Sequence, residues 1–144
     1  MRLRLPDEHA TAALGARLAG RARPGDVLLL EGPLGAGKST LARAFIRALA
    51  EDQGLTVPSP TFTLVQSYET PRGEVWHYDL WRLDGPEGLH ELGWDEAEDK
   101  IVLVEWPERL GALTPPGALH LRLSHDGAAR EIELQGEERW LHGL

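Results

Sequence analysis

The eight residues Gly32–Ser39 constrain this chain more than any other feature, because their sequence, GPLGAGKS, fits G-x-x-x-x-G-K-[S/T] in full. In this motif a glycine-rich turn joins a buried strand to a helix and encloses phosphate groups. Both neighbours are present: the apolar run Val27–Glu31 precedes the motif, and Ser39–Glu51 carries apolar residues on one helical face. In a chain of this length and composition, the expected number of chance matches to the motif is about 0.002. We therefore predict that the chain binds a nucleoside triphosphate.

Each residue type in the motif suits one part of a triphosphate. Gly35 and Gly37 let the backbone curl so that successive N–H groups face phosphate oxygens, and the following helix adds its partial positive end. Lys38 can bridge the β- and γ-phosphates, and the Ser39 hydroxyl can bind the accompanying Mg²⁺. Only two of the 15 Lys+Arg residues are lysines, so a lysine at this position is informative. The predicted phosphate-binding residues are Gly35, Ala36, Gly37, Lys38, Ser39 and Thr40.

Two acidic residues are candidates for the strand-end acid that holds magnesium or orients water in a P-loop nucleotidase. Glu105 ends the apolar run Ile101–Val104, and Asp79 ends Val75–Tyr78. Because ligands lie at the carboxyl ends of strands in α/β sheets, both side chains can face the phosphates. The alternative for each is a solvated acid at a strand end.

Hydroxyl groups lie between the loop and these acids, in the proline-stiffened sequence PSPTFT at residues 58–63. Thr61 and Thr63 can reach a γ-phosphate or its metal ion, as switch segments do, or can simply form turn and strand. Arg82 is a candidate either for stabilising transition-state charge or for a surface ion pair. The chain contains no asparagine, so it lacks the N-K-x-D sequence of guanine sites, and we expect adenine as the base.

The apolar runs predict an α/β fold in which buried strands alternate with helices. Strands are expected at Met1–Leu5, Val27–Glu31, Thr61–Tyr68, Val75–Leu80, Ile101–Glu105, Ala118–Leu123 and Arg130–Leu134, and helices at Asp7–Arg21 and Ser39–Glu51. We expect one domain over residues 1–144, with a mostly parallel central sheet flanked by helices and an antiparallel element at its C-terminal end. Trp76, Trp81, Trp94 and Trp106 are expected to fill core or interface volume, and the six histidines to be structural or on the surface.

Composition excludes several function classes. The chain has no cysteine, which rules out disulfides and cysteine metal sites. The formal net charge is −8, and residues 84–108 carry nine acidic side chains against one lysine, so we expect poor nucleic-acid binding by the chain alone. That acidic stretch is either a solvated face or a docking surface for a basic partner. With no apolar run long enough to cross a bilayer, we expect a cytoplasmic protein with no membrane contact.

Four sequence motifs together resemble the TsaE (YjeE) family of small bacterial ATPases. They are Gly32–Ser39, the SPTFTLV of residues 59–65, the HYDLWRL of residues 77–83 and the LVEWP of residues 103–107. Their order and spacing match the family over residues 6 to about 130, which is most of the chain. Pro33, Ser39 and Trp81 depart from the family's usual Asp, Thr and Tyr-like residues. The serine keeps the magnesium-binding hydroxyl, whereas Pro33 removes a charge from the loop.

The resemblance implies a P-loop NTPase fold and an ATP-hydrolysing, Mg²⁺-dependent component of the machinery that makes tRNA threonylcarbamoyladenosine. It further implies that the TsaB and TsaD proteins are partners, with tRNA contacted only through that complex. Ser39 and Glu105 would take magnesium, and Lys38 and the loop would take the phosphates. Asp79 would be a catalytic or water-orienting acid, so that the catalytic residues are Lys38, Asp79 and Glu105. Thr61 and Thr63 would belong to a switch-like segment, and Thr11 and Arg130 would flank the nucleoside. The alternatives are a small-molecule kinase and a nucleotide-gated binding module with negligible turnover.

Overall fold

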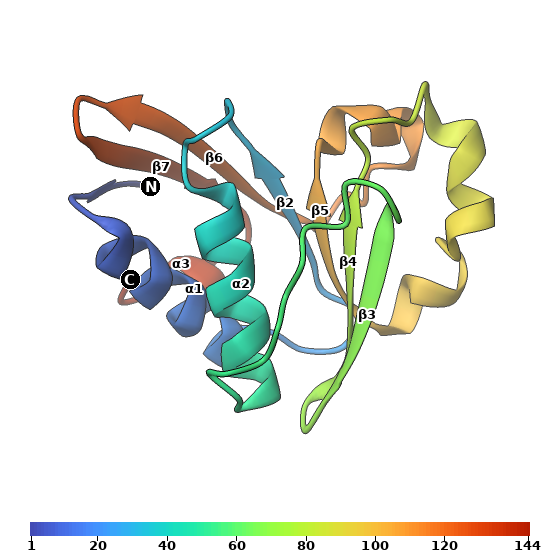
Figure 1. The fold of residues 1–144 in the computed structure, drawn as a ribbon, viewed down its shortest axis with the longest axis horizontal. Coiled ribbons are helices and arrows are strands. Elements are labelled where there is room, and N and C mark those ends of the chain that lie inside the picture. Colours follow the sequence, from blue (N-terminus) through green and yellow to red (C-terminus); the bar gives the residue numbers. More distant parts are fainter.

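Seven strands form one sheet in the order β1-β7-β6-β2-β5-β4-β3 in the computed structural model, which describes residues 1–144 (Figure 1). The strands are β1 (Arg2–Leu5), β2 (Val27–Glu31), β3 (Val65–Thr70), β4 (Gly73–Asp79), β5 (Ile101–Glu105), β6 (Leu119–Asp126) and β7 (Ala129–Gln135). The α-helices are α1 (Glu8–Arg21), α2 (Lys38–Ala50) and α3 (Glu138–Leu141), and the 3-10 helices are η1 (Pro86–Leu92), η2 (Glu96–Asp99) and η3 (Pro107–Leu113). None of the helices combines the length and apolarity needed to cross a membrane.

The centre of the sheet is parallel and both of its edges are antiparallel. Strands β6, β2, β5 and β4 run parallel to one another, whereas β1–β7, β7–β6 and β4–β3 pair antiparallel. The expected antiparallel C-terminal element is therefore confirmed, but a mostly parallel sheet is not, since the second edge is also antiparallel. The reason is the two-residue turn Pro71–Arg72 between β3 and β4, because so short a connection can only make a hairpin.

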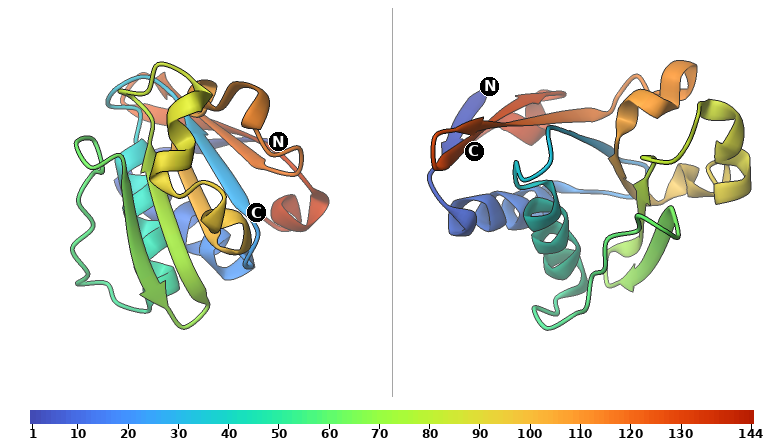
Figure 2. Two further views of the ribbon diagram at one scale, coloured as in Figure 1. Left: turned by 90° about the vertical axis from the view of Figure 1, so that its right-hand side faces the viewer. Right: turned by 45° about the horizontal axis from the view of Figure 1, so that its top comes forward.

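Two apolar cores lie on opposite faces of the sheet. Helices α1 and α2 cover one face, and the 3-10 helices lie on the other (Figure 2). In β5, Ile101 and Leu103 pack in the core under α1 and α2, while Val102 and Val104 pack in the core under the 3-10 helices. This alternation follows from the two-residue period of a strand that is covered on both faces. Consequently Glu105, two residues after Leu103, lies on the face that α2 covers.

The expected strand Thr61–Tyr68 begins four residues late. Residues 61–64 form a turn instead, closed by the Leu64 N–H donating to the Pro60 carbonyl at 2.6 Å, with Leu64 in the left-handed region at φ 69°. Pairing with β4 starts only at Val65, opposite Tyr78. The turn leaves Phe62 79% exposed and places Thr61 beside the end of β4.

Of the four tryptophans expected to fill core or interface volume, three pack against the core and one lies on the surface. Trp76, Trp94 and Trp106 are half-buried against the core under the 3-10 helices, but Trp81 is 48% exposed. Its ring instead packs against the ring of Trp106 at a tilt of 54°, with centroids 4.8 Å apart. The one fully buried tryptophan is Trp140, on the short helix α3.

Helices α1 and α2 pack closely enough that a glycine is required at one contact. A Cβ at Gly15 would lie 2.8 Å from the Leu41 carbonyl oxygen, whereas a Cβ at Gly20, on the exposed face of the same helix, would meet nothing within 4 Å. We expect Gly15→Ala to lower the free energy of unfolding by about 1–3 kcal/mol through overpacking. Gly20→Ala should raise it by about 0.5–1 kcal/mol, because alanine is the better helix former. Urea unfolding followed by circular dichroism measures both, and equal stabilisation by the two variants would contradict this packing.

Candidate functional site

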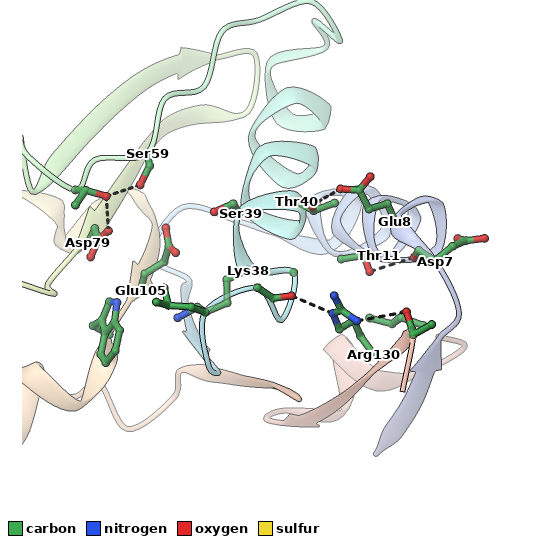
Figure 3. A pocket seen from close by; sticks show the side chains of 17 residues that line it. Asp7, Glu8, Thr11, Lys38, Ser39, Thr40, Ser59, Asp79, Glu105 and Arg130 are labelled. Carbon is green, nitrogen blue, oxygen red and sulfur yellow. Dashed lines mark hydrogen bonds between the residues drawn. The ribbon is translucent and has the colours of Figure 1, made fainter. Parts of the chain in front are cut away.

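Most of the residues singled out in the sequence meet at the carboxyl ends of the parallel strands (Figure 3). The loop after β2 and the last residues of β4 and β5 border a cavity of about 410 Å³, a size typical of small-ligand sites. This location is where ligands bind in α/β sheets. The cavity is lined by Leu5, Asp7, Glu8, Thr11, Leu34, Gly35, Gly37, Lys38, Ser39, Thr40, Ser59, Thr61, Asp79, Glu105, Trp106, Ala128 and Arg130.

The loop presents a series of backbone donors to this cavity. Gly35 and Gly37 have φ values of 78° and 102°, in a region that glycine enters without steric cost. No hydrogen bond within the protein uses the N–H groups of residues 34, 35 or 37–40, and helix α2 begins at Lys38 without a side-chain cap. Unpaired N–H groups at a helix N-terminus attract anions. The loop therefore has the donors that a phosphate group needs.

Lys38 brings a positive charge into the cavity without an acidic partner. Lys38 is only 8% exposed, and its ammonium lies 4.8 Å from the centroid of the Trp106 ring. None of the ion pairs or side-chain hydrogen bonds in the structure involves it. A buried ammonium that is paired only with an aromatic face leaves its charge available to an anionic ligand.

The two strand-end acids are neighbours across the sheet. Asp79 pairs with Glu105 in the parallel register of β4 and β5, so both side chains project from the same face. Asp79 is 5% exposed, and both of its carboxylate oxygens accept a hydrogen bond. Oδ1 accepts from the backbone N–H of Trp81 at 3.1 Å, and Oδ2 accepts from the Thr61 hydroxyl at 3.3 Å. A further hydroxyl contact of 2.8 Å joins Thr61 to Ser59, which ties the proline-stiffened segment to this acid.

Glu105 is held differently, by a residue that sequence reasoning missed. Its Oε2 lies 2.7 Å from Nε2 of His77, and the two residues are 6% and 2% exposed. His77 was expected to be structural or on the surface. The sequence does indicate which face His77 occupies. It precedes Asp79 by two residues on the same strand, so both side chains point to the same face of the sheet. The pairing with Glu105 depends on the register of two strands and is not visible along the chain.

The other end of the cavity is formed by α1, α2 and β7. The Thr40 hydroxyl donates to Glu8 at 3.3 Å, and the buried Thr11 hydroxyl donates to the Asp7 carbonyl at 3.4 Å. Asp7 itself caps α1 by accepting from the Ala10 N–H at 2.9 Å.

Arg130 on β7 fixes the glycine-rich loop from this side. Its Nε donates to the Gly35 carbonyl at 3.1 Å, so a residue far along the chain contacts the loop directly. This contact leaves the Gly35 N–H unused.

Three of the residues singled out lie outside the cavity lining. Thr63 is exposed and accepts from the Gln66 amide at 3.0 Å. Ala36 is buried, and its N–H donates to the Pro33 carbonyl at 3.2 Å, which closes the turn of the loop. Arg82 makes no ion pair and lies over the exposed Phe62 ring at 5.0 Å.

The oxygen atoms available in the cavity suit a hard cation. Ser39 offers a hydroxyl, and Oε1 of Glu105 has no hydrogen-bond partner. No group of three or more His, Asp or Glu side chains in the structure is arranged so that it could hold a metal ion by itself. Mg²⁺ commonly uses one or two protein oxygens together with phosphate oxygens and water, so this donor set fits it.

The fold and the cavity together define an α/β nucleotide-binding protein with a glycine-rich loop at the carboxyl ends of its parallel strands. A family model described as "Threonylcarbamoyl adenosine biosynthesis protein TsaE" matches residues 5–132. The chain therefore belongs to the TsaE family, which confirms the resemblance seen in its motifs.

Individual relatives agree with this assignment. Proteins named tRNA threonylcarbamoyladenosine biosynthesis protein TsaE from Rickettsia felis and Haemophilus influenzae are 38% and 34% identical over 120 and 137 residues. The alignments cover 83% and 90% of this chain, and 70% and 85% of those proteins. The crystal structure of Bacillus subtilis YdiB superposes with a TM-score of 0.76 at 31% identity, covering 98% of this chain and 88% of that one.

Proposed function

We propose that this chain is a Mg²⁺-dependent ATPase with a P-loop NTPase fold, acting as one domain over residues 1–144 in tRNA threonylcarbamoyladenosine biosynthesis. The observation that carries the proposal is the charge arrangement in the cavity. Lys38 has no acidic partner there, although Asp79 and Glu105 line the same cavity, and the loop beside it has unpaired N–H groups. A site with these free positive groups suits a polyanionic ligand such as a triphosphate. Its two carboxylates are available to hold a metal ion and to orient water.

In this proposal the loop and Lys38 hold the phosphates of ATP. The N–H groups of Gly35, Gly37, Lys38, Ser39 and Thr40 are free to donate to phosphate oxygens, while Arg130 holds the loop by its Gly35 carbonyl. Lys38 neutralises charge on the outer phosphates, moving from the Trp106 face to do so. Ala36 acts by closing the turn rather than by touching phosphate.

Ser39 and Glu105 are the proposed magnesium ligands, through the hydroxyl and the unpartnered Oε1. Mg²⁺ supplies charge neutralisation on the phosphate that is transferred to water. Asp79 orients the attacking water, and its two hydrogen bonds, from Trp81 and Thr61, keep the carboxylate in place. Thr61 connects Asp79 to Ser59 in the proline-stiffened segment, residues 58–63. A conformational change in that segment would therefore shift the Asp79 carboxylate.

The end of the cavity beside Thr11, Glu8 and Arg130 is the proposed place for the adenosine. We further propose TsaB and TsaD as partners, with tRNA contacted through them. The concentration of acidic side chains in residues 84–108 is compatible with a chain that leaves tRNA contacts to its partners.

Calorimetric titration with ATP tests the nucleotide and its metal. We expect one ATP bound per chain in Mg²⁺, at least about tenfold tighter than in EDTA, since Mg²⁺ connects the phosphates to Ser39 and Glu105. GTP should bind more weakly, because the chain lacks the N-K-x-D sequence of guanine sites. No heat of binding with ATP, or equal affinity with and without Mg²⁺, would contradict the proposed site.

A further inference from the structure

Glu105 is held by one donor only, and that donor is His77. The distance from Nε2 to Oε2 is 2.7 Å, and no other side chain bonds to the carboxylate. A carboxylate can only accept, so the ring donates through its Nε2–H. Asp79, by contrast, is fixed by two donors, Thr61 and Trp81. The orientation of Glu105 thus depends on one contact that the proposed chemistry does not itself use.

The imidazole has no other polar function where it lies. His77 is 2% exposed on the face of β4 that α2 covers, and its Nδ1 is fully buried without a hydrogen-bond partner. An aliphatic side chain would suit such a position better, because a buried polar atom without a partner is destabilising. The histidine is therefore explained by its contact with Glu105 and not by packing.

From this geometry we infer that His77 is a positioning residue, which holds Oε2 of Glu105 so that Oε1 is presented to Mg²⁺. The inference rests on the proposed function, because it concerns the metal ligand of that site. The small cavity of about 60 Å³ next to the pair is lined by both His77 and Ser39, so the ring lies close to the second proposed ligand as well. Outer contacts that orient a metal ligand typically change metal affinity by about 10- to 100-fold.

The test compares two amides at position 77. Glutamine places its amide nitrogen at about the reach of Nε2, whereas asparagine reaches only as far as Nδ1. A non-hydrolysable ATP analogue is titrated into each protein in EDTA and at increasing Mg²⁺. We expect His77→Asn to raise the Mg²⁺ concentration for half-maximal tightening by about 10- to 100-fold, and His77→Gln to stay within about threefold of the unmodified chain. Affinity in EDTA should be unchanged in both.

The outcomes separate the inference from the function on which it rests. If the unmodified chain shows no Mg²⁺-dependent tightening, the proposed function and this inference both fail. If it does, and His77→Asn has the same Mg²⁺ dependence, the inference alone is overturned. If His77→Asn and His77→Gln both bound the ATP analogue more weakly, and by the same factor in EDTA and in Mg²⁺, the role of His77 would be merely structural. That result would also overturn the inference. Should His77→Asn not fold, His77→Leu, which suits a buried strand, takes its place with the same expected result.

Discussion

We expect Lys38→Ala to weaken ATP binding by about 100- to 1,000-fold, which corresponds to about 3–4 kcal/mol. The size follows from the environment of the ammonium: it is almost fully buried and has no acidic partner, so it is available to the phosphates at a low local dielectric. Calorimetric titration with ATP and Mg²⁺ measures the loss. Because Lys38 makes no ion pair in the protein, the thermal unfolding temperature should change little.

Lys100→Ala is the matched control, since Lys100 is the only other lysine in the chain. It lies just before β5, at the opposite end of that strand from Glu105, and pairs with Glu74 at 3.0 Å and Asp99 at 3.6 Å. Its loss should leave ATP affinity unchanged, because neither Lys100 nor its two acidic partners line the cavity. Retained ATP affinity in Lys38→Ala, or equal loss in both variants, would refute the assignment of the loop.

The two acids should fail in different ways when they are changed to their amides. Asp79→Asn should reduce ATP turnover by about 100- to 1,000-fold while ATP affinity remains within a few fold, because this side chain acts on water and is proposed to touch neither phosphate nor metal. Glu105→Gln should reduce turnover by a similar factor and also remove most of the Mg²⁺-dependent tightening of ATP binding. Single-turnover hydrolysis and calorimetry measure the two quantities separately.

Glu108→Gln controls for the loss of one negative charge near the site. Glu108 is exposed, three residues beyond Glu105, and contributes no atom to the cavity. Turnover and affinity should both stay at the level of the unmodified chain. If Asp79→Asn and Glu105→Gln hydrolysed ATP as fast as the unmodified chain, neither carboxylate would act in hydrolysis. If the unmodified chain and all the variants bound ATP without hydrolysing it, the chain would be a nucleotide-binding module.

The parts of the site that the sequence predicts are those with local signals. The loop from Gly32 to Ser39 is contiguous, so its motif and its flanking strand and helix can be recognised together. Glu105 and Asp79 each end an apolar run, and parallel strands bring such ends to one edge of the sheet. These placements need only the period of a strand and the direction of its neighbours.

The remaining features depend on contacts between distant segments. The bond from His77 to Glu105 requires the particular register that places Asp79 opposite Glu105, and no pattern along the chain encodes that offset. The late start of β3 follows from a turn that closes between Pro60 and Leu64, where threonine and phenylalanine favour a strand by propensity. Contacts with the end of β4 stabilise this turn against the local preference: the Thr61 hydroxyl donates to Asp79, and the Asp79 N–H donates to the Leu64 carbonyl. Thr63 is left outside the cavity.

We propose that this cavity hydrolyses ATP in support of tRNA modification. The most direct measurement is ATP turnover by the purified chain in Mg²⁺, alone and with TsaB and TsaD, with Lys38→Ala as the blank. We expect turnover that rises when the partners are added and that is lost in the blank. Turnover at the level of the blank, with and without the partners, would contradict it.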